Sequence, residues 1–261
     1  MRSTLKKFNV IEILYPIGMY YLVSGFVFFA LNILFGEAQE IYMIKQLISS
    51  GATIPFLAAT WKQDMHTEKV VFGKQALKPG EYALQAVLSA VTAGALGVAL
   101  NNFIAMTPLV EVSAGFQNAN ENFFAGVVFV EILASCVVVP IAEELLFRGI
   151  VLKRATMMAG ETMGIVCSAL LFGVIHMNLV QFVYATLIGA VLAVIVAKTR
   201  RVSFAIIGHA VANLIAILRA ETGILEFSYQ ADVAGIIFFV VLAVLGAGAG
   251  WLLLKRSRKA S

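Results

Sequence analysis

The chain has 261 residues, of which 61% are hydrophobic and 13% are charged, and its mean hydropathy is +0.91. A soluble domain has about 45–50% apolar and about 25% charged residues, so this composition excludes an ordinary soluble domain and predicts a polytopic membrane protein. The net charge of +4 does not indicate a nucleic-acid partner, because the basic residues lie in loops, where they orient a membrane chain. We expect a single integral membrane domain over residues 1–261.

Eight apolar segments follow one another along the chain, and each approaches the roughly 20 residues that a helix needs to cross the bilayer core. The first follows Arg2, Lys6 and Lys7, but it is too long for the apolar core of a signal peptide, so we expect it to be retained. This pattern predicts an all-α bundle of about eight transmembrane helices. The predicted helices cover residues 9–35, 41–60, 82–104, 122–152, 162–178, 180–198, 203–219 and 232–254.

The loops differ in charge, and by the positive-inside rule this difference predicts the orientation of the chain in the membrane. If both termini are cytoplasmic, all but two of the 19 Lys and Arg residues fall on the cytoplasmic side, and only Lys45 and Arg219 fall outside. We expect a multi-pass protein of the plasma (cytoplasmic) membrane with both ends inside. The cytoplasmic set comprises Arg2, Lys6, Lys7, Lys62, Lys69, Lys74, Lys78, Arg148, Lys153, Arg154, Lys198, Arg200, Arg201, Lys255, Arg256, Arg258 and Lys259.

Most of the predicted helices avoid charged side chains, and the exceptions of interest cluster in three helices late in the chain. A charged group at the centre of a span costs about 2.5–3.5 kcal/mol on insertion scales, so each is a candidate functional residue. Glu144 and Arg148 are four residues apart and can pair on one helix face. A buried ion pair can also be purely structural, and a single buried His can simply bond a neighbouring helix. The candidates are Glu143, Glu144, Arg148, His176, His209 and Asn213, and Glu131 also lies in the fourth predicted helix, toward its outer end.

The depth of these residues predicts that they meet. At about 1.5 Å per residue, Glu143 lies about 15 Å from the level of Lys153 and His209 about 12 Å from the level of Arg201. We expect a water-filled cavity near the midplane, open to the cytoplasm, with a helix kink at Pro140 beside it. The third histidine, His66, lies in a polar loop and is assigned no function.

Two kinds of hydrolytic chemistry fit these side chains. A Glu can act as general base toward water while His and Asn side chains stabilise an oxyanion. Alternatively, Glu143, His176 and His209 could hold a zinc ion, with Glu144 as base. Other protease classes are excluded, because the chain has no HExxH and no GxSxG motif, and Asp64 and Asp232 are its only aspartates.

At these residues the sequence resembles the CAAX protease and bacteriocin-processing (CPBP) intramembrane endopeptidases, a family that includes the type II CAAX prenyl endopeptidases. The resemblance covers about residues 120–220, the family-like catalytic core. It rests on three motifs in the family's order: EExxxR in "EELLFR" (143–148), FxxxH in "FGVIH" (172–176) and HxxxN in "HAVAN" (209–213).

The resemblance implies an intramembrane endopeptidase and a role for each matched residue. Glu143 would be the general base, His176 would help to activate water, and His209 and Asn213 would form the oxyanion site. Glu144 would pair with Arg148, and Phe172 would pack beside His176. Family members have also been described as metalloendopeptidases. We favour a glutamate-dependent site without a metal, because Asn213 is a poor zinc ligand and Glu144 is the partner of Arg148.

Two other functions remain open at this stage. The chain could be a non-proteolytic immunity or scaffold protein that keeps the fold, or an ion-coupled transporter, although no internal repeat supports the latter. If it is a protease, its partners are membrane lipid and a peptide or protein substrate. That substrate could be a prenylated C-terminus, a leader peptide or a regulatory membrane protein.

Overall fold

The computed structural model describes residues 8–72 and 77–257, and within them the chain forms helices and no strand. The predicted all-α membrane bundle is therefore confirmed. Side chains are described for 8–65 and 77–257, so the side chains of His66 and Lys69 lie outside the described residues. The same holds for Arg2, Lys6, Lys7, Lys74, Arg258 and Lys259.

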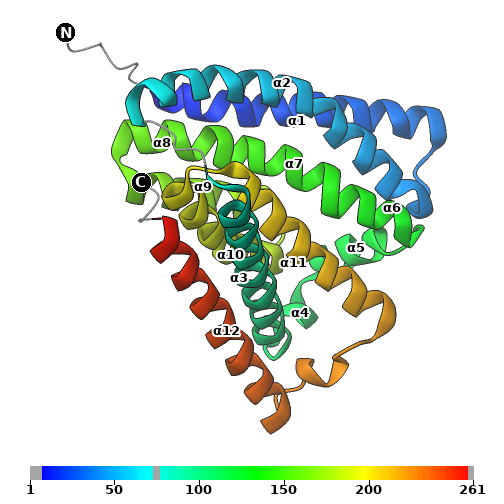
Figure 1. Cartoon of the computed structure of the whole chain (residues 1–261). Helices are drawn as coiled ribbons and strands as arrows, with labels where there is room; N and C mark the ends of the chain where they lie inside the picture. Colours follow the sequence, from blue (N-terminus) through cyan, green and yellow to red (C-terminus); the bar gives the residue numbers. More distant parts are fainter. Residues whose placement is uncertain (1–7, 73–76, 258–261) are drawn as a thin grey trace.

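Three groups of helices surround the candidate site (Figure 1). Helices α1 (Val10–Phe35) and α2 (Tyr42–Phe72) form an antiparallel pair along one side. Helix α3 (Pro79–Ala105) packs against α11 (Val202–Thr222) and α12 (Val233–Ser257) on the other side. Helices α9 (Glu161–Val174) and α10 (Leu179–Thr199) pair with each other. Short connecting helices are η1 (Gln39–Ile41), α4 (Leu109–Val112), α5 (Ala114–Phe123) and η4 (Glu226–Tyr229).

The central helical stretch carries the carboxylates and is wound irregularly. It runs through α6 (Val128–Ile132), the π-helical η2 (Leu133–Val138), α7 (Val139–Glu144), the π-helical η3 (Leu145–Val151) and α8 (Leu152–Ala159). A π-helical segment precedes Pro140 and a second one follows Glu144. Such segments often occur at functional sites, because they rotate the side chains that follow. A kink at Pro140 itself remains a prediction.

All eight predicted segments are helical, but they differ in length and polarity. Among the described residues, five helices are long and apolar enough to cross a membrane, namely α1, α3, α10, α11 and α12. A sixth span is counted if α5 and the stretch 128–159 form one bent unit, with an angle of 113°. Helix α9 has only 14 residues, or about 21 Å at 1.5 Å per residue, which is less than the bilayer core. The count of eight spans remains a prediction.

Ion pairs join the helix ends that carry the basic residues. Arg154 on α8 contacts Asp64 on α2, with Nε to Oδ2 at 2.7 Å, and donates to the carbonyl of Glu12 on α1. Lys198 on α10 pairs with Glu161 on α9. These helix ends therefore lie at one end of the bundle, as an alternating topology requires. Their orientation relative to the cytoplasm remains a prediction.

The two exceptions to the charge asymmetry are buried. Lys45 donates hydrogen bonds to Asn32 Oδ1 (2.7 Å) and to the carbonyl of Gly36 (3.0 Å), so it caps the C-terminal end of α1. Arg219 donates to Asn102 Oδ1 and to Ser228 Oγ, each at 2.8 Å. Both cations connect helices rather than face solvent, which explains why they break the pattern.

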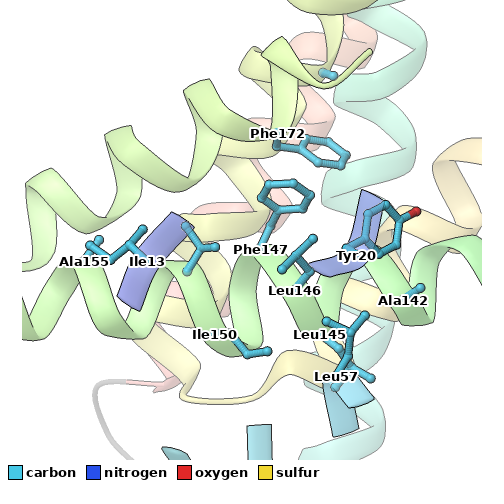
Figure 2. Packing of buried hydrophobic residues seen from close by; sticks show 12 residues of the cluster. Ile13, Tyr20, Leu57, Ala142, Leu145, Leu146, Phe147, Ile150, Ala155 and Phe172 are labelled. Atoms are coloured by element: carbon cyan, nitrogen blue, oxygen red, sulfur yellow. The ribbon is translucent and has the colours of Figure 1, made fainter. Parts of the chain in front are cut away.

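A hydrophobic cluster supports the side of the stretch 139–151 that faces α1, α2 and α9. Phe147 and Phe172 stack edge to face, with ring centroids 5.2 Å apart, and join η3 to α9 (Figure 2). Leu57 and Leu146, both fully buried, join this stretch to α2. Because this side of the stretch is closely packed, the carboxylates are held on a rigid element.

Candidate active site

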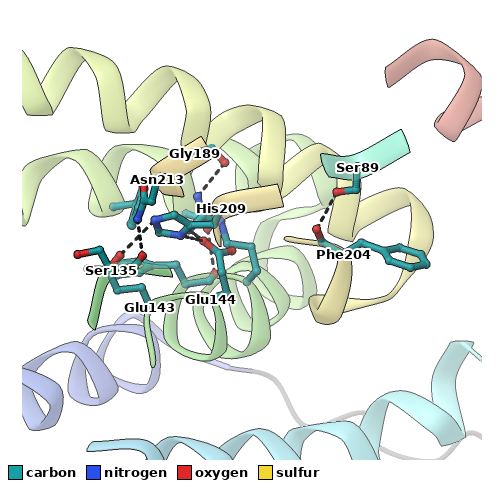
Figure 3. A network of polar contacts seen from close by, with 12 residues as sticks. Ser89, Ser135, Glu143, Glu144, Gly189, Phe204, His209 and Asn213 are labelled. Atoms are coloured by element: carbon teal, nitrogen blue, oxygen red, sulfur yellow. Dashed lines mark hydrogen bonds and ion pairs between the residues drawn. The ribbon is translucent and has the colours of Figure 1, made fainter. Parts of the chain in front are cut away.

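Glu144 is the centre of a buried polar network (Figure 3). Its Oε1 accepts one hydrogen bond from Arg148 Nη1 and another from His209 Nδ1, both at 2.9 Å. The Glu144 and Arg148 side chains are fully buried, and that of His209 is 12% exposed. A carboxylate can accept only a proton-bearing nitrogen, so Nδ1 of His209 carries a proton. Glu144 therefore fixes the orientation of His209 from the neighbouring helix.

Arg148 is held on three sides. Besides Glu144, it donates Nη2 to the carbonyl of Gly189 on α10 at 3.0 Å. Its guanidinium lies over the Phe172 ring, 4.3 Å from the centroid, and a cation in this position is attracted by the ring. The predicted pair with Glu144 is present, and Arg148 also ties the central stretch to α9 and α10.

Glu143 faces the other imidazole nitrogen. Its Oε2 lies 3.9 Å from His209 Nε2, so His209 stands between the two carboxylates. Glu143 is 8% exposed, whereas Glu144 is fully buried. Arg148 and His209 Nδ1 both donate to Glu144, whereas no hydrogen bond to Glu143 is formed by either. Glu143 is thus the carboxylate that remains accessible.

Asn213 is anchored to a carbonyl that Pro140 leaves free. In the π-helical register of η2, in which Val139 N donates to the carbonyl of Ala134, the Ser135 carbonyl would pair with the amide of residue 140. Proline has no N–H, and the Ser135 carbonyl instead accepts a hydrogen bond from Asn213 Nδ2 at 2.7 Å. The second N–H of the Asn213 amide points away from this bond and can serve another acceptor.

His176 lies in the turn between α9 and α10, not on the helix that was predicted to reach residue 178. Helix α9 ends at Val174, and the chain turns through Met177, which has a φ of 59°, to Asn178, the N-cap of α10. His176 Nδ1 donates to the carbonyl of Phe172 at 2.8 Å, so the lone pair of a neutral ring is on Nε2. The position of His176 is set by this turn. A hydropathy pattern does not reveal such a turn.

Phe172 brings the two histidines near each other. Its ring packs edge to face against both imidazoles, with centroid distances of 5.1 Å to His176 and 5.8 Å to His209. The side chains predicted from the three motifs thus converge on one region of the bundle. The midplane depth of that region and its opening to the cytoplasm remain predictions.

Comparison with known proteins identifies the family. Residues 124–215 match the family model described as type II CAAX prenyl endopeptidase Rce1-like, and this range contains every motif residue of the site. The match supports this family assignment over the part of the chain that carries the candidate site. No curated protein and no solved structure matches it. The match and the apolar helices together support an integral multi-pass membrane protein and, in general terms, a CAAX-type intramembrane protease.

The side chains proposed for zinc, all within the described residues, are not grouped as a metal centre in this arrangement. Among residues 8–65 and 77–257, no three His, Cys, Asp or Glu side chains are grouped as metal ligands. Of the proposed ligands, Glu143 and His209 are adjacent, but His209 Nδ1 is already bonded to Glu144, and His176 belongs to a separate turn. The side-chain geometry therefore gives no three-ligand set.

Several residues that support the site escaped the sequence reasoning. Gly189 and Ser135 contribute only backbone carbonyls, which no motif can report. Tyr20 and Tyr21 on α1 lie close enough to interact electrostatically with Glu143, and Tyr21 donates to the carbonyl of Ile175 at 3.4 Å. Of these residues, only Ser135 could have been inferred from the sequence, because it lies five residues before Pro140, which has no N–H to offer its carbonyl.

We expect Gly189→Ala to damage the site. A Cβ at Gly189 would lie 2.9 Å from Phe172 Cδ1 and 3.0 Å from Arg148 Nη2, so it would push both side chains from their places. Such overpacking costs about 1–3 kcal/mol of stability, and it should also reduce proteolysis. Thermal unfolding in detergent and cleavage assays would measure both. Gly25→Ala on α1, with nothing within 4 Å, is the matched control and should not lose stability. Equal behaviour of the two variants would contradict the close packing at Gly189.

Proposed function

We propose that the protein is a glutamate-dependent intramembrane endopeptidase that hydrolyses membrane-associated peptides, including prenylated or leader peptides. The observation that carries this proposal is His209, which lies between Glu144, its orienting partner, and Glu143, the accessible carboxylate. A carboxylate and an oriented imidazole are the groups that hydrolysis of an amide by water needs. We further propose the plasma (cytoplasmic) membrane as its location.

In the proposed mechanism Glu143 takes the proton of a water molecule as that water attacks the scissile carbonyl carbon. His176, through the lone pair on Nε2, orients the water. The negative charge that develops on the carbonyl oxygen is stabilised by a protonated His209 Nε2 and by the second N–H of Asn213. Glu143 then transfers its proton to the leaving amine, which completes the cleavage and restores the base.

The supporting residues keep these groups fixed before substrate arrives. Arg148 neutralises Glu144, and Glu144 holds His209 at 2.9 Å. The Ser135 carbonyl holds Asn213 at 2.7 Å. Preorganised donors are effective because no reorganisation is needed during the reaction. Three further residues contribute to this positioning. Pro140 leaves the Ser135 carbonyl free for Asn213, and Phe172 and Gly189 both contact Arg148.

The substrate class is tested with purified protein in detergent. We expect release of the C-terminal peptide from a prenylated CAAX peptide, or of the leader from a leader peptide, with Glu143→Gln inactive on the same substrate. Comparative peptidomics of cells with wild type or Glu143→Gln would then find the natural substrate. A folded wild type that cleaves no member of a panel of prenylated and leader peptides, or cleavage equal to that of Glu143→Gln, would refute the proposal.

The metal-free mechanism makes a separate prediction. We expect protein purified without added metal to cleave its substrate, and a strong chelator to leave the rate unchanged. Elemental analysis of the same sample gives the bound zinc per chain. Stoichiometric zinc, with activity lost to the chelator and restored by zinc, would replace the mechanism by zinc-activated water, with Glu143, His176 and His209 as ligands after a rearrangement.

A further inference from the structure

His176 lies in the short connection between α9 and α10, so no regular helix fixes its position. The three amides of residues 175–177 donate to carbonyls of α9 at 3.2 to 3.4 Å. The usual N–H···O distance is about 2.7–3.2 Å, so these bonds are at or beyond the long end of the range. The backbone bonds inside the connection are therefore weak, and other contacts must hold the residue that orients water in the proposed mechanism.

The connection also contains a strained residue. Met177 has a φ of 59°, in the left-handed region, which the Cβ of any residue other than glycine makes unfavourable. Such a conformation persists only where the surrounding contacts outweigh its cost. The contacts that reach across Met177 are therefore the ones that keep the turn in shape.

The side chain of Asn178 reaches across Met177 and joins His176 to α10. Asn178 Nδ2 donates to the His176 carbonyl at 3.1 Å and to Gln181 Oε1 at 2.6 Å. Asn178 Oδ1 accepts the backbone N–H of Gln181 at 2.9 Å, as the N-cap of a helix does. The two N–H groups of the amide and its oxygen are thus all in use. Asn178 therefore caps α10 by accepting a hydrogen bond and holds His176 by donating one.

The support that α1 gives to the same turn is weaker. Tyr21 Oη donates to the Ile175 carbonyl at 3.4 Å, which exceeds the usual O–H···O range of about 2.5–3.0 Å. Helix α10, in contrast, is tied to the site, because its Gly189 carbonyl accepts from Arg148 Nη2 at 3.0 Å. Asn178 thus links His176 to the helix that Arg148 holds.

We propose that Asn178 is a positioning residue for His176, and that it acts through the hydrogen bond from Nδ2 to the His176 carbonyl. The His176 ring is itself fixed to its own turn, because Nδ1 donates to the Phe172 carbonyl at 2.8 Å. A shift of the backbone at residue 176 would therefore displace Nε2, the nitrogen that orients the water. This inference rests on the proposed function, and Asn178 lies outside the three motifs that carry the family resemblance.

Asn178→Asp removes the donor and keeps the cap, because an aspartate oxygen can still accept the Gln181 N–H. We expect kcat for peptide cleavage to fall by about 10- to 100-fold, the effect of displacing a reacting group by up to about 1 Å. KM and the thermal unfolding midpoint should stay close to those of the wild type. Asn178→Ser is also a good N-cap and adds no charge, so an equal loss of kcat in this variant would exclude the aspartate charge as the cause.

The matched control makes the same chemical change at another N-cap. Asn9 begins α1 and accepts the Glu12 N–H at 2.9 Å. Asn9→Asp keeps that bond and lies outside the site, so it should leave kcat unchanged. A loss of kcat in Asn9→Asp equal to that in Asn178→Asp would overturn the inference, because the effect would then be common to the N-caps.

A double-mutant cycle separates positioning from a general loss of folded enzyme. His176→Ala removes the imidazole, so the addition of Asn178→Asp should lower kcat no further. A multiplicative loss in the double variant, or a wild-type kcat in Asn178→Asp, would overturn the inference while the wild type still cleaves and the proposed function stands. A wild type that cleaves no substrate would refute the proposed function, and this inference would be refuted with it.

Discussion

Glu143→Gln is expected to lower the rate of peptide cleavage by about 10²- to 10⁴-fold, the range that a general base contributes, while the protein remains folded. The amide has nearly the same size as the carboxylate but cannot take a proton from water. Glu143 keeps 8% exposure and stands 3.9 Å from His209 Nε2, so its neutralisation removes no short buried ion pair. The rate and the thermal unfolding midpoint are to be measured on the same detergent-purified sample.

The neighbouring carboxylate provides the contrast for this experiment. Glu144→Gln makes the same chemical change one residue away, but Glu144 accepts bonds from Arg148 and His209 with one oxygen and is fully buried. We expect this variant to lose stability as well as activity. If Glu143→Gln were as unstable as Glu144→Gln, the EExxxR motif would be structural. If Glu143→Gln retained activity, the base would have to be another group.

The sequence predicted the helical architecture well, because hydrophobic length is a local property. Each of the eight apolar segments coincides with helical structure, and the GxxxG spacing of Gly246 and Gly250 also has a packing role. A Cβ at Gly246 would lie 2.7 Å from Leu96, and one at Gly250 3.2 Å from Thr92, both on α3. Close approach of two helices at small residues follows directly from side-chain volume.

Less could be predicted where backbone geometry depends on tertiary contacts. The position of His176 was misjudged because an apolar run cannot show that α9 stops at Val174. The π-helical turn before Pro140 is stabilised by a hydrogen bond from Asn213, which is 78 residues away from Ser135, so no local pattern encodes it. The pairing of His209 with Glu144 belongs to the same class, since depth along a helix does not reveal which nitrogen faces which carboxylate.

These three features have a common consequence for the site. Motif residues identify the side chains, whereas their roles depend on partners that the motifs do not contain. His209 shows this clearly. The family resemblance implied an oxyanion donor, and the contacts add an orienting carboxylate on one side and the accessible carboxylate on the other. The buried pair of Glu144 and Arg148 holds His209, the proposed oxyanion donor. The same contacts therefore serve both folding and catalysis, and substitution of Arg148 tests this connection.

Arg148→Ala is expected to destabilise the protein by about 3–5 kcal/mol, because it leaves the Glu144 carboxylate buried without its cation. The loss also removes the bond to the Gly189 carbonyl and the contact with the Phe172 ring. Arg256→Ala is the matched control, since its ion pair with Glu81 is solvent-exposed and should contribute at most about 1 kcal/mol. Unfolding in detergent and the yield of folded protein measure the difference. Equal stability of the two variants would contradict a tightly coupled buried pair.

The double variant Glu144→Leu/Arg148→Met separates folding from catalysis. Replacement of both buried charges by apolar side chains of similar size is often neutral, so stability should recover most of what Arg148→Ala loses. Cleavage should not recover, because His209 Nδ1 has lost the oxygen to which it donates at 2.9 Å, and its Nε2 is no longer held toward Glu143. A stable double variant with wild-type activity would show that Glu144 does not position His209. A stable and inactive one would show that the buried pair is retained for the orientation of the imidazole rather than for the stability of the bundle.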